Sequence, residues 1–314
     1  MSNFIRPFNK ISKRDVRLAG GKGASLGEMT QAGMLVPPGF VVLAAAFDRF
    51  LDETDLSLEV EAGLKKVNYK DTNSVDRASN VIRDLIHDAQ MPKDLQTIIL
   101  AEFKKLKRPL VAVRSSATAE DSTQASWAGE LETYLNTTEK TLLGRVKQCW
   151  SSLYTPRAIF YRNEQGMRKS RVSVAVVIQT MVQSEISGIT FTVHPVTKDR
   201  NQMIIEAGYG LGEAIVSGQI TPDSYVVGKR NLDLLDINVA EQKRMLIKKG
   251  ASGNAWQPVP KTRQHSQKLT GKQIIELANI CIRIEKYYRK PQDIEWAFAK
   301  GKFYITQSRP ITTL

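Results

Sequence analysis

Residues 172–181 form a nearly continuous apolar run that is rich in valine. A run of this kind predicts a strand that is buried on both faces, because neither face carries the polar residues that water would require. A sheet that contains such a strand must be covered by other elements on each side. This requirement constrains the fold more than any other feature of the chain.

Further strands are predicted where short apolar runs lie between turn residues, at 40–43, 110–114, 131–135, 186–193, 202–207, 293–299 and 303–308. Apolar residues at helical spacing predict helices up to residue 32, through most of 44–107, and over 139–163 and 273–289. Residues 231–268 are polar and irregular, which predicts an excursion on the surface. Helices alternate with strands, which allows an α/β or an α+β fold, and we favour α+β.

The chain has 314 residues, which is long for a single core, so we expect two lobes with a cleft between them. The approximate division is an N-terminal lobe over 1–175 and a C-terminal lobe over 176–314. We find neither a secretion signal nor an apolar stretch of membrane-spanning length. Cys149 and Cys281 are too few and too far apart for a disulfide framework, so we expect a cytoplasmic protein.

The formal net charge is +13, and the basic residues recur in short clusters rather than in one block. A solvated basic surface explains this pattern, and an acidic partner subunit is the alternative. Because no RNA-binding or DNA-binding signature accompanies the charge, we expect no nucleic-acid partner, and we expect no membrane partner either.

A glycine cluster surrounds Lys22 in the segment Gly20-Gly21-Lys22-Gly23. Glycines let backbone amides approach phosphate oxygens, and a lysine adds a positive charge. The spacing of the Walker phosphate loop is absent. A tight turn with a surface lysine is the alternative interpretation.

Arg114 ends the predicted strand 110–114 and precedes a segment of small polar residues. An arginine at the end of a buried strand is held rigidly and can bind a phosphate through two hydrogen bonds. The segment that follows could act as a mobile lid. A structural salt bridge to Glu120 or Asp121 is the alternative.

The two terminal strands predict a hairpin whose register decides its chemistry. A two-residue turn at Lys300-Gly301 would set Glu295 opposite Thr306 and place Gln307 on the other face. An odd-length loop or a bulge at Gly301 would set Glu295 opposite Gln307. The second register gathers a carboxylate, an amide oxygen and the Arg309 guanidinium, a set suited to magnesium and a triphosphate. An edge hairpin with an exposed ion pair remains the alternative.

Three other features are less informative. Gln179 ends the buried strand and could face an adenine, although a plain strand end explains it as well. The glycines of 208–213 lack the full dinucleotide-binding pattern. His87, His194 and His265 have neither metal-ligand spacing nor a nucleophilic triad around them.

Together these segments resemble the phosphoenolpyruvate synthase and pyruvate phosphate dikinase family, which includes rifampicin phosphotransferase and phenylphosphate synthase. The resemblance covers nearly the whole chain and depends on motifs that occur in the family's order: Gly20-Gly-Lys-Gly-Ala-Ser-Leu-Gly-Glu28, Arg114-Ser-Ser-Ala-Thr-Ala-Glu-Asp121, Ala128-Gly-Glu-Leu-Glu-Thr133, Gln179-Thr-Met-Val182, Ser187-Gly-Ile-Thr-Phe-Thr192, Gly210-Leu-Gly-Glu213, Thr221-Pro-Asp223, Asp293-Ile-Glu-Trp296 and Gln307-Ser-Arg-Pro310.

The resemblance implies an ATP-grasp fold that binds ATP and Mg²⁺ between two lobes. Carried over by position, the phosphate contacts are Lys22, Arg114 and Arg309, and the magnesium ligands are Glu295 and Gln307. The loop over the phosphates includes Gly129 and Thr133. The adenine and ribose contacts are Gln179, Met181, Val182 and Glu185. The chain departs from the family pattern at Trp127, Glu130, Tyr209 and His194, and Glu130 adds a negative charge near the expected phosphate loop.

In this family a histidine on a separate swivelling domain accepts the phosphoryl group from ATP and leaves AMP. None of the three histidines of this chain lies in the Thr-Gly-Gly…Ser-His setting of that carrier. We therefore expect a phosphohistidine partner subunit, as in phenylphosphate synthase, or C-terminal domains missing from this sequence. A non-catalytic ATP-sensing subunit, a rifampicin phosphotransferase-type ATP domain and an ATP-grasp ligase that forms an acyl phosphate are the alternatives.

Overall fold

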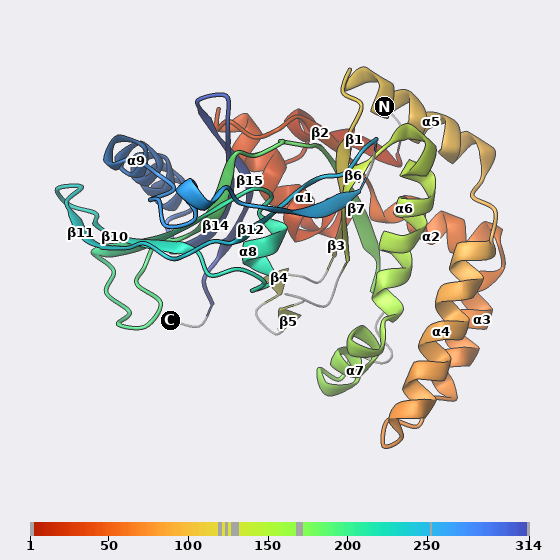
Figure 1. The fold of residues 1–314 in the computed structure, drawn as a ribbon. Coiled ribbons are helices and arrows are strands. Elements are labelled where there is room, and N and C mark those ends of the chain that lie inside the picture. Colours follow the sequence, from red (N-terminus) through yellow and green to blue (C-terminus); the bar gives the residue numbers. More distant parts are fainter. Residues whose placement is uncertain are drawn as a thin grey trace. The chain divides into compact units, whose positions relative to one another are not determined.

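A computed structural model describes residues 3–118, 121–122, 125–126, 132–167, 172–251 and 253–312 (Figure 1). The chain divides into two compact units, Met1–Gln31 with Pro38–Met181, and Ala32–Pro37 with Val182–Leu314. The division falls after Met181 rather than near residue 175, because the preceding strand belongs to the inside of the first unit's sheet. Segment 32–37 belongs to the second unit, where the amide of Ile305 donates to the carbonyl of Leu35 at 2.9 Å.

The first unit is built on a five-stranded antiparallel sheet in the order β1-β2-β7-β3-β6. Its strands are β1 (Ile5–Pro7), β2 (Gly39–Val42), β3 (Val111–Ala117), β6 (Thr133–Thr137) and β7 (Val174–Thr180), and β4 (Asp121–Ser122) pairs with β5 (Ala125–Ser126). Its helices are η1 (Phe8–Lys10), η2 (Lys13–Asp15), α1 (Val16–Gln31), α2 (Ala44–Glu53), α3 (Leu56–Lys65), α4 (Thr72–Asp88), α5 (Lys93–Lys105), α6 (Glu139–Ser151), η3 (Ser152–Tyr154) and α7 (Pro156–Glu164).

Strand β7 is the inner strand that the apolar run predicted. Residues Val174–Ile178 have no exposed surface, and helices cover both faces of the sheet. Helix α1 packs on one face, while α2 and α6 pack on the other, where the Phe50 ring stacks on Trp150 at 5.0 Å. The predicted strand buried on both sides is therefore confirmed.

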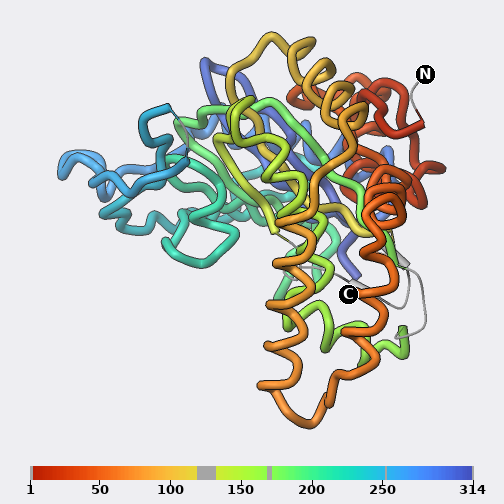
Figure 2. The backbone as a smooth tube through the Cα atoms, turned by 90° about the vertical axis from the view of Figure 1, so that its right-hand side faces the viewer, coloured from red at the N-terminus to blue at the C-terminus, as the bar shows by residue number. Residues whose placement is uncertain are grey.

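Helices α3 and α4 lie side by side as a long hairpin at the end of the helical layer (Figure 1, Figure 2). Residues 139–163, predicted to be helical, are helical except at Thr155, where the chain is divided into α6 and η3 on one side and α7 on the other. Thr155 causes the break: its side chain accepts a hydrogen bond from the Ala158 amide at 3.1 Å, and Pro156 begins the next helix.

The second unit contains a six-stranded antiparallel sheet in the order β11-β10-β9-β8-β14-β15, with α9 packed against β9 and β14. Its elements are β8 (Ile186–Phe191), β9 (Gln202–Tyr209), α8 (Glu213–Val216), β10 (Asp223–Gly228), β11 (Leu234–Asn238), β12 (Arg244–Lys248), β13 (Asn254–Pro258), η4 (Lys261–Arg263), α9 (Gly271–Tyr288), β14 (Gln292–Ala299) and β15 (Lys302–Pro310). The irregular excursion expected at 231–268 contains three of these strands. Every ladder between named strands is antiparallel, so the α+β class is confirmed.

A fully buried ion pair fastens the start of β10. The Lys268 ammonium lies 2.8 Å from an Asp223 carboxylate oxygen, and both side chains have no exposed surface. The same carboxylate accepts from the Tyr225 hydroxyl at 2.7 Å and from the amides of Lys268 and Ala240. The Thr221-Pro-Asp223 motif therefore serves to join β10 to the segments that precede β12 and α9.

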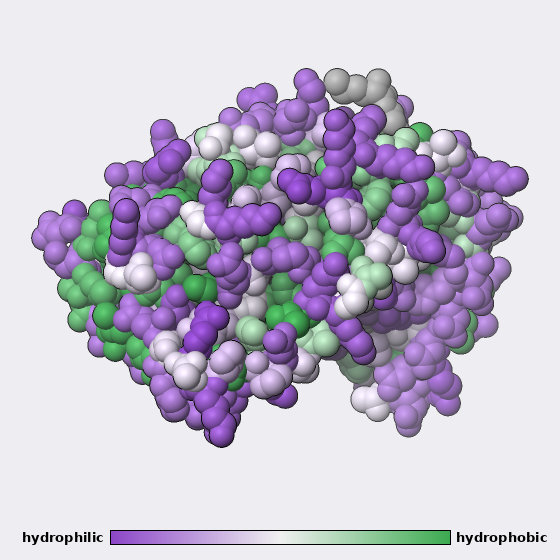
Figure 3. Space-filling view, turned by 45° about the horizontal axis from the view of Figure 1, so that its top comes forward, coloured by the Kyte–Doolittle hydropathy of each residue, from purple (hydrophilic) through white to green (hydrophobic). Residues whose placement is uncertain are grey.

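Apolar side chains gather at the left edge of the face in Figure 3, on the side where Figure 1 shows β10 and β11. Strand β11 is the edge of its sheet, Leu235 and Ile237 are exposed on it, and Val239 is exposed directly after it. The remainder of this face is mainly hydrophilic. Among the helices that the structure describes, none combines the length and apolar character needed to cross a membrane.

We predict that Asp223→Asn lowers the free energy of unfolding of the second unit by about 3 kcal/mol. The substitution leaves the Lys268 ammonium buried without its counter-ion. Urea denaturation followed by circular dichroism measures the loss.

Glu241→Gln is the matched control, because Glu241 pairs with Lys243 at 3.3 Å on the exposed surface. This control should change stability by less than about 0.5 kcal/mol. Equal stability of Asp223→Asn and the control would show that the buried pair does not fasten β10.

Candidate functional site

The predicted glycine cluster is a kink inside α1. Gly20 has φ 68° and ψ 171°, which interrupts the helix and starts a new helical turn at Gly21 and Lys22. Positive φ favours glycine, and a Cβ on Gly20 would lie 2.1 Å from the Ser116 hydroxyl oxygen. The Gly23 amide donates to that hydroxyl at 3.3 Å. The kink therefore holds the Lys22 turn directly against the end of β3.

Three predicted site residues share one face of the first sheet. Arg114 lies opposite Thr133 on β6 and opposite Val177 on β7, and Gln179 lies opposite Ala112. Residues directly opposite across a ladder project to the same face, as do residues two apart along a strand. Arg114, Thr133 and Gln179 therefore lie on the face that α1 covers, the face against which the Lys22 turn packs.

Lys22 and Arg114 differ in exposure. Arg114 is 8% exposed, whereas Lys22 is half-buried. Burial raises the pKa of the Cys149 thiol on α6, Glu132 raises it further, and the positive charges of Lys22 and Arg145 oppose this shift.

The residues expected at the adenine differ in what they offer a ligand. Gln179 is 3% exposed, and its side-chain nitrogen makes no hydrogen bond to any residue that the structure describes. A buried amide nitrogen of this kind is suited to a polar ligand edge. The amide of Met181 already donates to the Leu110 carbonyl at 3.1 Å. A ligand at Met181 would therefore have to contact the Met181 carbonyl oxygen or side chain rather than the amide.

Gly129, predicted in the loop over the phosphates, lies outside the described residues, as do Trp127 and Glu130. Thr133 follows this segment, is exposed, and begins β6.

In the second unit the terminal hairpin adopts the register that pairs Glu295 with Gln307. The turn is the two-residue type, with Lys300 at φ 51° and Gly301 at φ 71°. The ladder shifts between Glu295 and Trp296, because Trp296 pairs with Ile305 and Thr306 is the additional residue. The bulge therefore lies at Thr306 rather than at Gly301.

The pair of oxygen donors suits magnesium, which prefers carboxylate and amide oxygens. Glu295 is half-buried and Gln307 is 6% exposed. Over the described part of the chain, no group of three or more His, Cys, Asp or Glu side chains could hold a metal ion. Glu295 and Gln307 could together supply two oxygen ligands to a magnesium ion at the hairpin.

Arg309 is held by Asp293, which the sequence reasoning missed. The Arg309 Nε and Nη2 atoms lie 2.8 and 2.7 Å from one Asp293 carboxylate oxygen. Burial raises the pKa of Asp293, Arg309 lowers it, and Glu295 raises it. Asp293 lies two residues before Glu295, so strand alternation alone could have indicated that both carboxylates share a face.

Glu206 on β9 is aligned with Glu295 across the sheet, in the row of paired residues that crosses β9, β8 and β14. No local sequence pattern indicates that Glu206 lies near the candidate site. Ile189 on β8 pairs with Glu206 on one side and with Glu295 on the other. Burial and the charge of Asp293 raise the pKa of Glu206. The row becomes visible only when β9, β8 and β14 are aligned in the sheet.

Glu185, the predicted ribose contact, is exposed and accepts a hydrogen bond from the Lys300 amide at 2.9 Å. It therefore ties the start of β8 to the turn of the terminal hairpin. Val182, the predicted adenine contact that lies in the second unit, is half-buried.

Two departures from the family pattern have local explanations. His194 Nδ1 accepts from the amides of Val196 and Thr197 at 3.3 and 3.2 Å, a turn contact that an Asn or Asp oxygen also makes. The Tyr209 ring lies under the Arg263 guanidinium at 4.4 Å. Both residues therefore have structural roles in the second unit.

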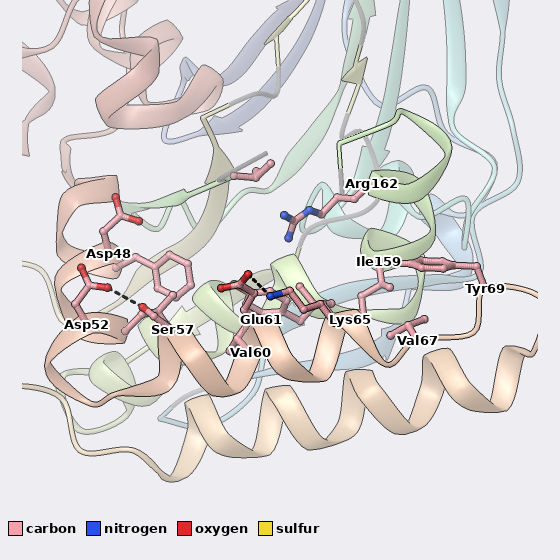
Figure 4. A pocket seen from close by; sticks show the side chains of 15 residues that line it. Asp48, Asp52, Ser57, Val60, Glu61, Lys65, Val67, Tyr69, Ile159 and Arg162 are labelled. Carbon is pink, nitrogen blue, oxygen red and sulfur yellow. Dashed lines mark hydrogen bonds and ion pairs between the residues drawn. The ribbon is translucent and has the colours of Figure 1, made fainter. Parts of the chain in front are cut away.

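A cavity of about 630 Å³ lies in the helical layer of the first unit (Figure 4). Asp48 and Asp52 lie on one side of it and Arg162 on the other, and the Glu61–Lys65 ion pair projects from α3. Among the predicted site residues that the structure describes in the first unit, none lines this cavity. Lys22, Arg114 and Gln179 are therefore separate from it.

Known proteins resemble this chain over almost its whole length. Residues 16–314 match the family model described as pyruvate phosphate dikinase, AMP/ATP-binding domain. The probable phosphoenolpyruvate synthase of Methanocaldococcus jannaschii is 45% identical over 99% of this chain. The phosphoenolpyruvate synthase of Pyrococcus furiosus is 41% identical over 99%, and the rifampicin phosphotransferase of Bacillus subtilis is 37% identical over 100%.

The chain spans only part of these relatives, covering 27% of the first, 44% of the second and 36% of the third. The matched part is the nucleotide-binding domain named by the family model. The motifs that position Lys22, Arg114 and the terminal hairpin all lie within it. The chain belongs to the pyruvate phosphate dikinase AMP/ATP-binding domain family.

Proposed function

We propose that this chain is the ATP-binding part of a dikinase-type phosphotransferase with an ATP-grasp fold. It uses Mg-ATP to phosphorylate a carrier histidine on a swivelling domain or a partner subunit, and it releases AMP. The observation that supports this most directly is the bulge that sets Glu295 opposite Gln307. The register places two hard oxygen donors together, with Arg309 two residues further along the strand.

The charges in the first unit support the same proposal. Lys22 and Arg114 are cations held on rigid backbone, Lys22 by the Gly20 kink and Arg114 by ladders on both sides. Preorganised cations stabilise the charge that develops on phosphoryl oxygens during transfer. In the proposed mechanism Lys22, Arg114 and Arg309 bind the phosphates, and Gln179 orients the adenine.

Magnesium would neutralise phosphate charge and align the triphosphate when bound by Glu295 and Gln307. The residues of this chain then position ATP for attack by the carrier histidine. Attack by the histidine nitrogen at the β-phosphorus forms the nitrogen–phosphorus bond and breaks the bond from that phosphorus to the oxygen that bridges to the α-phosphate. AMP leaves with that oxygen, and the histidine then carries the β- and γ-phosphates as a pyrophosphoryl group. Transfer of the γ-phosphate to water or to orthophosphate leaves the phosphohistidine.

The proposed partner supplies the histidine. His87 accepts or donates a hydrogen bond with Ser151 at 2.9 Å, and His194 forms the turn contact described above. His265 lies 3.4 Å from Glu241 on the surface. These contacts give each histidine a local role, which favours a carrier outside this chain. The relatives described above are named as phosphoenolpyruvate synthases and as a rifampicin phosphotransferase. These names differ in the molecule that finally accepts the phosphoryl group, so we assign no final acceptor to this chain.

Incubation with ATP labelled in the β-phosphate, together with candidate histidine-domain proteins, tests the proposal. The expected result is label on the partner and one AMP released per transfer. ATP binding without AMP release with any carrier would instead favour an ATP-sensing subunit.

We predict that Lys22→Ala and Arg309→Ala each lower the rate of AMP release by at least about 100-fold. Each substitution removes a charge that stabilises the transferring phosphoryl group. The rate is measured with a carrier protein that the wild-type chain phosphorylates, and circular dichroism confirms that each variant is folded.

Lys65→Ala and Lys243→Ala are the charge-matched controls, because both lysines are 73% exposed and pair with nearby glutamates. These variants should retain wild-type turnover. Unchanged AMP release in Lys22→Ala or Arg309→Ala would refute the assigned phosphate contacts.

We predict that Glu295→Ala reduces the gain in ATP affinity that Mg²⁺ provides by at least about tenfold. The wild-type chain should bind ATP more tightly with Mg²⁺ than with a chelator, because the metal joins Glu295 and Gln307 to the phosphates. Calorimetric titration under both conditions measures the difference.

Gln307→Leu should behave in the same way, whereas Glu241→Ala, which removes an exposed carboxylate, should not. A Mg²⁺ effect of wild-type size in both hairpin variants would place the metal elsewhere.

A further inference from the structure

We propose that Glu132 is a positioning residue that holds Arg114 and Thr133 in place for phosphate binding. The Glu132 carboxylate itself accepts hydrogen bonds from other residues of the protein, on the face of the sheet opposite to Arg114. The inference rests on the proposed function, because Glu132 has this role only if Arg114 binds a phosphate and Thr133 belongs to the loop over the phosphates.

The main chain of Glu132 is fixed to β3 next to Arg114. Its carbonyl oxygen accepts two hydrogen bonds from Ser115, one from the amide at 3.1 Å and one from the hydroxyl at 2.8 Å. Ser115 follows Arg114, and Thr133, which follows Glu132, pairs with Arg114 in the ladder. Arg114, a proposed phosphate contact, and Thr133, predicted in the loop over the phosphates, are therefore both direct neighbours in sequence of the residues that form this double hydrogen bond.

The side chain of Glu132 is held by two donors from different elements. Arg83 Nη2 on α4 donates to Oε1 at 2.7 Å, and the Tyr134 hydroxyl on β6 donates to Oε2. The Arg83 and Glu132 side chains are only 23% and 28% exposed. Charge-assisted hydrogen bonds in partly buried positions are stronger and better oriented than those on the surface.

Tyr134 is itself fixed in the position from which it donates. Burial and the hydrogen bond to Glu132 raise the pKa of the Tyr134 phenol, so it stays protonated. The Arg145 guanidinium lies over the Tyr134 ring, 4.6 Å from its centre. Helices α4 and α6 thus both contribute to holding the Glu132 carboxylate.

The alternation of β6 assigns the two roles to opposite faces. Thr133 shares a face with Arg114, so Glu132 and Tyr134 project to the other face, where α4 and α6 pack. A carboxylate bound there by Arg83 and Tyr134 is poorly placed to act as a phosphate or metal ligand. Its effect on nucleotide binding is transmitted through Ser115 and the ladder.

Groups that orient metal ligands from behind are typically worth about 10- to 100-fold in affinity, and we apply the lower end of this range to a residue that orients a phosphate contact. We expect Glu132→Gln to weaken the binding of Mg-ATP by about tenfold and to leave the affinity for adenosine unchanged. Adenosine lacks the phosphates, so its affinity should not change if Glu132 acts only by positioning the phosphate-binding residues. Calorimetric titration of the chain with Mg-ATP and with adenosine, together with its melting temperature, measures both.

The matched control is Glu53→Gln. Glu53 accepts from the Arg49 guanidinium at 2.6 Å in the same unit, in an exposed ion pair far along the sequence from the site. This variant should bind both probes as the wild-type chain does. A Glu132→Gln chain that loses ATP and adenosine affinity equally, with a lower melting temperature, would show a role in stability alone and overturn the inference.

Tyr134→Phe and Arg83→Met are the second variants, because each removes one donor and leaves Glu132 in place. Each should weaken Mg-ATP binding without weakening adenosine binding, and unchanged Mg-ATP affinity in both overturns the inference even if Glu132→Gln does not fold. A wild-type chain that fails to bind Mg-ATP contradicts the proposed function instead, so the two failures can be distinguished.

Discussion

The two ladders that flank β3 are the constraint on which the first unit's candidate site depends. Paired with β7 on one side and β6 on the other, β3 has no freedom to shift without breaking backbone hydrogen bonds in a buried sheet. Arg114 therefore keeps one position, and Ser116 provides the surface on which the Gly20 kink rests. Lys22, more than ninety residues away in sequence from Arg114, is positioned by this same strand.

A comparable constraint acts in the second unit through close contact between strands. A Cβ on Gly188 would lie 1.8 Å from the Glu206 carbonyl oxygen and 2.4 Å from the Trp296 ring. The bare glycine therefore lets Trp296 pack against β8, and Trp296 pairs with Ile305 immediately before the bulge. Packing on the α9 face thus supports the register that places Glu295 opposite Gln307 on the other face.

The motifs that carry the family resemblance serve different purposes in this fold. Some hold side chains that we propose as ligands, such as Lys22 and Gln307. Others hold the sheets together: Asp223 forms a buried ion pair, and Gly188 permits close strand contact. Glu132 belongs to neither category alone. Its carboxylate is bound by other residues of the protein, and its main chain holds the neighbouring residues that we propose near the phosphates. A motif shared by a family therefore does not by itself identify a ligand.

The sequence by itself determined the local elements, because side-chain periodicity records which face of a strand or helix is buried. It predicted the inner strand over 172–181, the α+β class and two possible hairpin registers. Only the tertiary structure decided between those registers, through a bulge at Thr306 that shifts the ladder between Glu295 and Trp296. It also decided the strands within 231–268 and the position of the Glu206 carboxylate near Glu295. These features depend on pairing between segments distant in sequence, and no local pattern specifies which strands become neighbours.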